Sequence, residues 1–382
     1  MKETIYLDHA ATTPLDEDAL ARMLPYLKEV YGNADSPHST GRKAMRALDE
    51  ARDCVAELIG AKQNEIYFTS GGTESDNFAI IGGAKAKRSA DPTRTRVIIS
   101  SIEHHAALFA AETLKKDGFT ITYLPVNERG VVEVRTLEET IDSNVALVAL
   151  MAANNETGAL QPIQAASELA HEHGAVFFTD AVQYAPHRRI AVKELGVDML
   201  AFSAHKFNGP KGVGALYIKS GVKVEKLVGG GEQERGLRGG TSNVAGIVAL
   251  AAAYEKTVRE MSETEEKMLA LRRAFLQAIQ GVDGVYINGD ETGLPSILNL
   301  RIVGVSNTAF LYRMDLQGVC LAAGSACASA SVKPSHVLTA MSLTESEAGE
   351  SVRISFGKEN TESEILEAVA RMKETIAFLR KS

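Results

Sequence analysis

Short apolar runs of the kind that form buried β-strands alternate with amphipathic helical stretches over the first 240 residues. The strand candidates are 65–69, 96–100, 120–125, 145–151, 175–179, 199–203 and 213–218. Helical patterns lie between them, at 41–59, 74–87, 105–116 and 163–173. Several of the strands are continuously apolar, which is typical of strands buried on both faces, and the alternation is typical of βαβ crossovers. The sequence therefore predicts an α/β fold with a mostly parallel central sheet covered by helices.

The pattern changes after Gly240. Residues 244–279 are rich in Ala, Leu, Glu and Lys with few helix breakers, which predicts one long helix or two in series. The remaining elements that we expect are strands at 284–287, 296–302 and 352–356, and a last helix at 361–379. We therefore predict a large unit over 15–256 and a smaller α/β unit made of 1–14 together with 257–382, a division that fits a chain of 382 residues.

Composition narrows the functional class. Acidic residues outnumber basic ones by 49 to 41, which argues against direct binding of nucleic acid through bulk charge. No run of about 18 apolar residues and no signal-like N-terminus is present, so we expect neither a membrane span nor secretion. Cys54, Cys320 and Cys327 are too few and too scattered for a disulfide framework, which favours a cytoplasmic protein with reduced thiols. We expect no metal site, because no Cys-x-x-Cys pair exists and His171 and His173 point apart on a helix.

The strongest chemical signal is a lysine that follows a predicted strand. Lys206 lies in the stretch SAHKFNGPKG, directly after 199–203 and at the sheet edge where open α/β sheets bind ligands. A lysine in a confined, partly desolvated site has a lowered pKa and can form a Schiff base with an aldehyde. An exposed lysine in a loop is the ordinary alternative, and the other strand ends weigh against it.

Four more predicted strands end in polar residues. Asp180 could keep a heteroaromatic nitrogen protonated, although an aspartate here could equally cap a helix. Thr73 follows a Gly-Gly turn at a helix start, where backbone N–H groups form an anion cup, although such turns also occur for purely geometric reasons. His104 could stack on a flat cofactor or move protons, or could simply begin a helix, and Asn155 follows a further strand. The coincidence of five such strand ends favours a shared site.

Two residues of the C-terminal third complete the candidates. Cys327 lies in a small-residue stretch, GSACASAS, which we expect to be exposed, so it is either a nucleophile or an incidental surface thiol. Cys54 and Cys320 are expected to lie in the core. Arg353 could bind a carboxylate through two hydrogen bonds, or could be a strand-edge arginine that faces water.

Taken together, these motifs resemble the cysteine desulfurases, which are pyridoxal-phosphate enzymes of the aminotransferase class V group. The resemblance extends from YLDHAATTP at 6–14 to VRISFG at 352–357. The motifs between them are TSGGTES around Thr73, EH at His104, NNE around Asn155, DAVQ from Asp180, SAHK ending at Lys206, RGLRGGT ending at Thr241 and GSAC ending at Cys327. The resemblance implies a fold type I pyridoxal-phosphate enzyme that acts on L-cysteine.

The resemblance also implies a role for each residue. Lys206 would form the Schiff base with the cofactor, Asp180 would pair with the ring nitrogen, and His104 would stack on the ring and join Lys206 in proton transfer. The phosphate would be held by Gly72, Thr73, Ser203 and His205, and by Thr241 from the second subunit of a homodimer. Asn155 and Gln183 would contact the phenolic side of the ring. Arg353, with Asn155, would bind the substrate carboxylate. Cys327 would take the substrate sulfur as a persulfide, releasing alanine.

The stretch from Cys327 to Glu350 resembles the longer-loop branch of the family, whose persulfide passes to partner proteins. The acceptor would be an iron–sulfur scaffold protein or a tRNA-thiolating enzyme. Three positions depart from the family pattern: Ala34-Asp35 stands where Pro-Ser is expected, and Ala328 stands where Thr or Ser is usual. A selenocysteine lyase, or another pyridoxal-phosphate lyase in which Cys327 is incidental, is the alternative enzyme, and an interaction module with a degenerate site is the non-enzymatic one.

Overall fold

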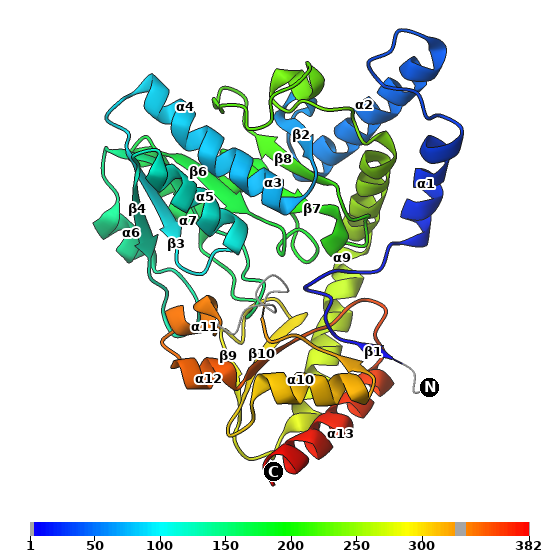
Figure 1. Ribbon diagram of the computed structural model, residues 1–382, viewed down its shortest axis with the longest axis vertical. Coiled ribbons are helices and arrows are strands. Elements are labelled where there is room, and N and C mark those ends of the chain that lie inside the picture. Colours follow the sequence, from blue (N-terminus) through cyan, green and yellow to red (C-terminus); the bar gives the residue numbers. More distant parts are fainter. Residues whose placement is uncertain (1–3, 325–333, 382) are drawn as a thin grey trace.

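The computed structural model describes residues 4–324 and 334–381, and Figure 1 shows a larger α/β part above a smaller one. The larger part is built on a seven-stranded sheet in the order β2-β8-β7-β6-β5-β3-β4. Its strands are β2 (Ile66–Thr69), β3 (Arg96–Ser100), β4 (Thr120–Leu124), β5 (Val145–Ala149), β6 (Val176–Asp180), β7 (Met199–Ser203) and β8 (Gly214–Ile218). Strand β8 pairs antiparallel with β2 and β7, and the other neighbours pair parallel. The predicted mostly parallel sheet is confirmed.

Helices cover both faces of this sheet, which explains why most of its strands are buried along their length. Val97 and Ile99 of β3 pack in one cluster with the π-helical turn Phe78–Gly82, α4 (Gly83–Ala90) and α5 (His105–Lys116), whereas Ile98 packs in another with α2 (Ser39–Ile59), α7 (Ile163–Glu172) and α9 (Val244–Ile279). Full burial of each such side chain contributes about 1.5–3 kcal/mol. The helices are α2 (Ser39–Ile59), α3 (Gly72–Asn77), which continues through a π-helical turn (Phe78–Gly82) into α4 (Gly83–Ala90), α5 (His105–Lys116), α7 (Ile163–Glu172) and α9 (Val244–Ile279).

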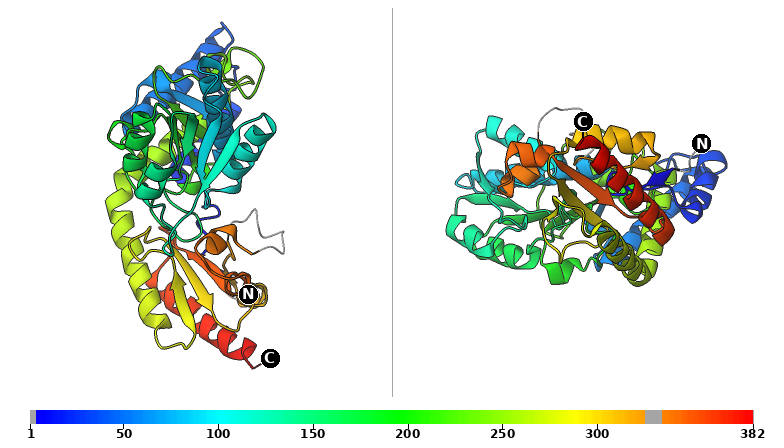
Figure 2. Two further views of the ribbon diagram at one scale, coloured as in Figure 1. Left: turned by 90° about the vertical axis from the view of Figure 1, so that its left-hand side faces the viewer. Right: turned by 90° about the horizontal axis from the view of Figure 1, so that it is seen from below.

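Helix α9 is a single helix of 36 residues, so the prediction of one helix rather than two in series is the correct one. Its first half contributes to the core of the larger part through Leu250 and Tyr254, and its second half packs into the smaller part through Met268 and Phe275. Figure 2 shows it running along one side of both parts. Because α9 passes through residue 257 without a break, the boundary placed there remains a prediction.

The smaller part contains an antiparallel sheet in the order β12-β10-β9. Its elements are β9 (Val285–Asn288), β10 (Ile297–Ile302), α10 (Asn307–Leu316), β11 (Val319–Cys320), α11 (His336–Ala340), α12 (Glu345–Gly349), β12 (Ser351–Ser355) and α13 (Glu362–Leu379). The N-terminal strand β1 (Ile5–Tyr6) pairs in parallel with β11, which places this strand on the smaller part.

Three helices of the larger part were not predicted: α1 (Glu17–Lys28), α6 (Val134–Thr140) and α8 (Val192–Leu195). Across the described ranges, no helix combines the length and the apolar character that crossing a membrane requires.

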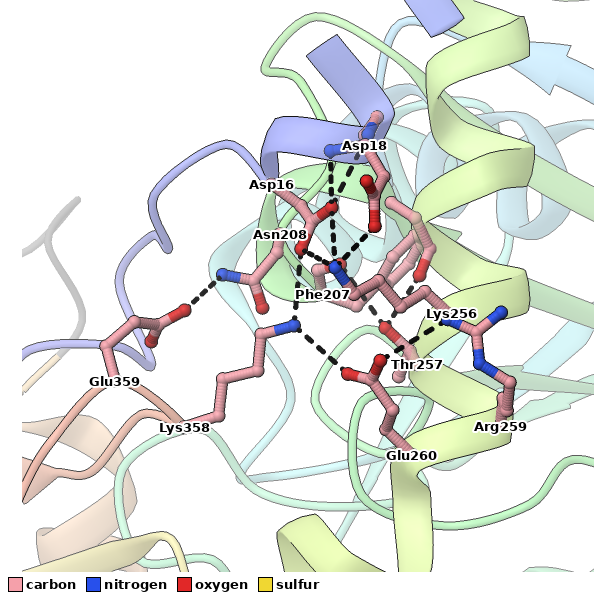
Figure 3. A network of polar contacts seen from close by, with 12 residues as sticks. Asp16, Asp18, Phe207, Asn208, Lys256, Thr257, Arg259, Glu260, Lys358 and Glu359 are labelled. Carbon is pink, nitrogen blue, oxygen red and sulfur yellow. Dashed lines mark hydrogen bonds and ion pairs between the residues drawn. The ribbon is translucent and has the colours of Figure 1, made fainter. Parts of the chain in front are cut away.

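A polar network joins the two parts where α9 crosses between them (Figure 3). Lys256 on α9 lies 2.9 Å from Asp16, the residue that caps α1. Lys358, which follows β12 in the smaller part, lies 3.4 Å from both Asp16 and Glu260 of α9. Single ion pairs of this kind contribute little, but a shared network fixes how the segments approach one another. The network therefore holds the start of α1 to the smaller part beside the stretch that carries Lys206.

Candidate active site

The polar strand ends predicted from the sequence meet at one edge of the large sheet. Strands β3, β5, β6 and β7 run in parallel, and β2 has the same direction as β7 because β8 is antiparallel to both. Their carboxyl ends therefore share an edge, which is where open α/β sheets bind ligands. Lys206 is near enough to shift the pKa of both Asp180 and His104. The structure therefore brings this predicted trio together.

The amine of Lys206 points into the protein. A short 3-10 turn (Ala204–Lys206) follows β7 and turns the lysine towards the N-terminal segment. Its Nζ donates to the carbonyl oxygens of Ala10 at 2.6 Å and Ala11 at 2.8 Å. Gln183 donates to the same Ala10 carbonyl at 2.8 Å. The N-terminal motif thus orients the lysine, a role that the sequence alone did not predict.

Asp180 is a buried carboxyl at the end of β6. Burial raises the pKa of Asp180 to about 6, although the backbone N–H of Val182 and the charge of Lys206 act in the opposite direction. Its Oδ1 accepts the Val182 N–H at 2.8 Å. A protonated ring nitrogen placed against this carboxyl would stabilise its charged form, because an opposite charge at short range lowers a carboxyl pKa. The site therefore fits a pyridinium ring.

His104 is a neutral imidazole. Burial, followed by the charge of Lys206, lowers the pKa of His104 to about 4. Its Nδ1 accepts the backbone N–H of Ala106 at 3.2 Å and caps α5, which assigns the proton to Nε2. An uncharged ring whose orientation is fixed by a cap is suited to stacking against a flat cofactor.

The Gly-Gly turn before α3 forms a close-fitting cup. Gly71 has φ +150°, a conformation that side chains rarely adopt. A Cβ on Gly214 of β8 would lie 2.7 Å from the Cα of Gly71, so the turn lies directly against the sheet. A Cβ built on Gly71 would lie 3.6 Å from the hydroxyl of Ser203 at the end of β7. Because helical structure from α3 to α4 begins at Gly72, the free N–H groups of Gly72 and Thr73 suit a phosphate group.

A Gly71→Ala substitution is expected to weaken binding of pyridoxal phosphate by about 5- to 150-fold, since strain in this backbone region costs of order 1–3 kcal/mol. The dissociation constant is measured by titrating the apoprotein with the cofactor and following visible absorbance. Gly60→Ala is the matched control, because Gly60 also has positive φ (+72°) but caps α2 with open space around it. Equal cofactor affinity in wild type and the Gly71 variant would show that this turn does not hold the phosphate.

Two more predicted cofactor ligands, His205 and Thr241, differ in their surroundings: His205 contacts the N-terminal segment, and Thr241 is exposed to solvent. His205 has its Nδ1 3.2 Å from the hydroxyl of Thr12, and burial lowers its pKa to about 4, with Lys206 contributing. Thr241 is exposed and lies just before α9. The preceding loop is held to the start of α3 by an ion pair of 2.8 Å between Arg238 and Glu74. The phosphate contacts of His205 and Thr241 remain predictions.

Arg353 of β12 lies in the interior, so the strand-edge alternative, in which it faces water, is wrong. The side chain is 1% exposed. Its Nη1 donates to the carbonyl oxygen of Asn155 at 2.9 Å, and its Nη2 donates to Asp8 at 2.6 Å. Its Nε is buried with no hydrogen-bond partner among the residues that the structure describes. This spare donor, next to Asn155, could bind a substrate carboxylate.

The three cysteines differ in position. Cys327 lies outside the described residues, so its nucleophilic role remains a prediction. Cys54 on α2 and Cys320 on β11 are free, partly buried thiols. Burial raises the pKa of Cys54 to about 11, with Glu255 and Glu57 adding to the effect, and burial together with Asp315 and Asp8 also raises the pKa of Cys320. Neither described thiol is therefore activated as a nucleophile.

Sequence reasoning missed two buried carboxyls beside Asp180. Burial raises the pKa of Glu103 to about 8, with a smaller effect from Asp180, while the Met151 N–H, 2.6 Å from Oε1, acts in the opposite direction. Burial, then Asp180 and Glu103, also raise the pKa of Asp76 well above its ordinary value. Glu103 is therefore largely protonated at neutral pH, and the raised pKa of Asp76 disfavours its charged form, so the negative charge of the cluster falls mainly to Asp180. The residues adjacent to Asp76 and Glu103 in the sequence, Ser75 and His104, are polar, so the local pattern did not predict that the two carboxyls are buried.

His187 is expected to make the protein less stable in acid. Burial, followed by the charge of Arg188, lowers the pKa of His187 to about 4, whereas in the unfolded chain it is about 6.5. Because the unfolded state binds this proton more tightly, the free energy of unfolding falls as the pH drops from 6.5 towards 4. Urea unfolding at pH 7 and pH 5 should show a smaller loss for His187→Gln than for wild type. An equal loss in both proteins would contradict this assignment.

Comparison with known proteins finds one family along nearly the whole chain. The family profile for Aminotransferase class-V matches residues 5–367. The chain is 44% identical over 367 residues to the cysteine desulfurase IscS of Dictyoglomus turgidum, covering 96% of this chain and 92% of the relative. It is 45% identical over 380 residues to the putative cysteine desulfurase IscS 1 of Bacillus subtilis, covering 99% and 100%.

Solved structures of similar fold also cover most of the chain. A NifS-like protein superposes with a TM-score of 0.91 at 36% identity, covering 98% of this chain and 100% of that one. A structure described as SspA in complex with cysteine superposes with a TM-score of 0.82 at 34% identity, covering 92% and 99%.

Proposed function

This chain belongs to the aminotransferase class-V family, and from that premise we infer that it is a pyridoxal-phosphate-dependent cysteine desulfurase. The structural observation that carries this conclusion is the inward-facing Lys206 beside Asp180 and His104 at the carboxyl edge of the sheet. The reaction converts L-cysteine to L-alanine. The substrate C–S bond breaks, an S–S bond forms to a thiol of the enzyme, and the carbon that carried the sulfur receives a proton. The relative whose structure is described with cysteine supports this substrate.

The residues at this edge fit pyridoxal phosphate. Asp180 suits the pyridinium nitrogen, the turn at Gly71 and Gly72 with Ser203 suits the phosphate, and the neutral His104 suits the ring face. When bound, the cofactor supplies an electron sink for negative charge at the substrate Cα. The carboxylate of Asp180 keeps that sink effective by holding the ring nitrogen protonated. Its charge is maintained because the raised pKa values of Asp76 and Glu103 behind it disfavour their charged forms.

Proton transfer falls to Lys206. Its amine is oriented by the Ala10 and Ala11 carbonyls, and a group held in one direction exchanges a proton with the substrate Cα without first reorienting. The Nε2–H of His104 is a hydrogen-bond donor at the site. Because burial holds the pKa of His104 near 4, its imidazole stays neutral throughout the physiological range.

Substrate binding is assigned to Arg353 and Asn155. Among the described residues the Nε of the buried guanidinium has no hydrogen-bond partner, whereas its Nη2 donates to Asp8. Arg353 forms a planar fork of donors that matches a carboxylate. Binding of the cysteine carboxylate would satisfy the buried donor and fix the amino group towards Lys206.

The sulfur acceptor within the enzyme is Cys327. We propose this role because its GSAC motif resembles that of the family and because burial raises the pKa values of the other two thiols, Cys54 and Cys320. We propose that the persulfide then passes to an iron–sulfur scaffold protein or a tRNA-thiolating enzyme. We also propose a cytoplasmic homodimer. Free thiols at Cys54 and Cys320 suit a reducing compartment, and the exposed Thr241 is available to a second subunit.

The reaction is tested by incubating purified, cofactor-loaded protein with L-cysteine and a reductant, and measuring alanine and sulfide. Equal amounts of the two products are expected. A protein that forms neither product from cysteine but releases alanine from selenocysteine would be a selenocysteine lyase instead.

A further inference from the structure

One buried carboxylate contacts the two described ends of the segment that carries Cys327. The Oγ of Ser335 donates to Oε2 of Glu156 at 2.6 Å. At the other end, a Cβ built on Gly324 would lie 2.9 Å from the same Oε2, so the backbone of Gly324 lies directly against the carboxylate. Glu156 is 1% exposed. A single side chain therefore contacts residues on both sides of Cys327 in the sequence.

Glu156 is itself rigidly held beside the active site. It lies in the turn after β5, where the side chain of Asn154 accepts the backbone N–H groups of Glu156 at 2.9 Å and Thr157 at 3.0 Å. Asn154 in turn donates to the carbonyl oxygen of Ile102 at 3.0 Å. The preceding residue is Asn155, whose carbonyl oxygen accepts from Arg353. Any residue that contacts Glu156 is therefore held at a fixed position relative to Asn155 and Arg353.

Ser335 transmits this contact into α11. Its Oγ accepts the backbone N–H of Leu338 at 3.2 Å and caps the helix while donating to Glu156. His336, the first residue of α11, has its Nε2 2.9 Å from the carbonyl oxygen of Glu103, and its ring centroid lies 4.6 Å from that of His105. The C-terminal end of the segment is therefore tied to the start of α5, next to His104.

We propose that Glu156 is a positioning residue that fixes both ends of the Cys327 segment relative to Lys206 and Arg353. The inference rests on the proposed sulfur transfer to Cys327. A hydrogen bond to a carboxylate is about twice as strong as a neutral one, so a single contact of 2.6 Å is an effective anchor. Loss of this anchor lowers the rate of the sulfur-transfer step and leaves the proton-transfer steps at Lys206 intact.

The experiment separates these two kinds of step. Sulfur transfer is measured as alanine released from L-cysteine, with kcat and KM determined separately. Proton transfer is measured as exchange of the Cα hydrogen of L-alanine with deuterated water, which requires the cofactor and Lys206 but not Cys327. Ser335→Ala and Glu156→Ala should each lower kcat for cysteine by about tenfold, the loss expected for a hydrogen bond to a charged group, and leave alanine exchange within about twofold of wild type. Glu156→Gln retains an acceptor and should show an intermediate loss.

Thr344→Ala is the matched control. The hydroxyl of Thr344 also caps a short helix, α12, where it accepts the backbone N–H of Glu347 in place of the contact with Glu156. This variant should leave both activities unchanged. Gly324→Ala is an independent probe, since its new Cβ would press on the carboxylate, and it should lower kcat for cysteine alone. The proposal is overturned if Ser335→Ala and Gly324→Ala retain wild-type kcat, or if alanine exchange falls by the same factor. A wild-type protein that never forms a persulfide on Cys327 would instead refute the proposed function.

Discussion

A Lys206→Ala variant is expected to lose desulfurase turnover by about 10⁴-fold, the upper range of what a lost proton-transfer group costs. The loss follows from geometry, because the amine that the Ala10 and Ala11 carbonyls orient towards the site is removed. The variant should also lose the covalent attachment of the cofactor. After treatment with borohydride and proteolysis, the wild-type peptide that contains residue 206 should carry the cofactor mass, and no peptide of the variant should.

Lys211→Ala is the control for this variant. Lys211 lies five positions further along the same turn and is exposed, so it should retain both the cofactor adduct and turnover. A Lys206→Ala protein that kept more than about a tenth of wild-type turnover would exclude this residue as the proton-transfer group.

A Cys327→Ser variant is expected to lose alanine formation from cysteine by at least about 100-fold while keeping the visible absorbance of the bound cofactor, because a hydroxyl cannot replace a thiolate as sulfur acceptor. Cys54→Ser and Cys320→Ser should each keep wild-type turnover, since burial raises the pKa of both thiols. Turnover is measured with saturating cysteine and a reductant that releases the transferred sulfur.

Two results with the cysteine variants would contradict the assignment of Cys327 as the sulfur acceptor. If Cys327→Ser retained alanine formation, another thiol, of the enzyme or of the added reductant, would take the sulfur, and Cys327 would not be the acceptor. A loss in Cys320→Ser alone would move the acceptor to β11, beside Asp8.

The sheet was predictable because its strands are apolar on both faces. The predicted bounds of β3 and β7 match the structure, as do those of α5 and α9, because in each case the pattern begins and ends sharply. Helix α1 was missed because Pro25 lies inside it and only Ala19 is buried. The contribution of the N-terminus to the smaller part depends on a two-residue pairing between β1 and β11, which no local pattern encodes.

The site was partly predictable for a topological reason. The carboxyl ends of parallel strands converge, so polar residues at successive strand ends predict a shared site even when their contacts are unknown. The contacts themselves depend on distant segments. Asp8 and Arg353 pair across 345 positions, and the Ala10 carbonyl receives Lys206 across 196. Backbone carbonyl oxygens are present at every residue, so nothing in the composition of the N-terminal segment marks these two as ligands of the lysine.

The central claim is that an amine at position 206 and a thiol at position 327 act on the same substrate. It is tested most directly by mixing cofactor-loaded protein with one equivalent of L-cysteine, without reductant, and measuring the intact mass followed by peptide mapping. We predict an adduct of about 32 daltons, one sulfur atom, on the peptide that contains Cys327, and its absence in Lys206→Ala. Formation of alanine with no such adduct, or with the adduct on Cys54 or Cys320, would contradict the account.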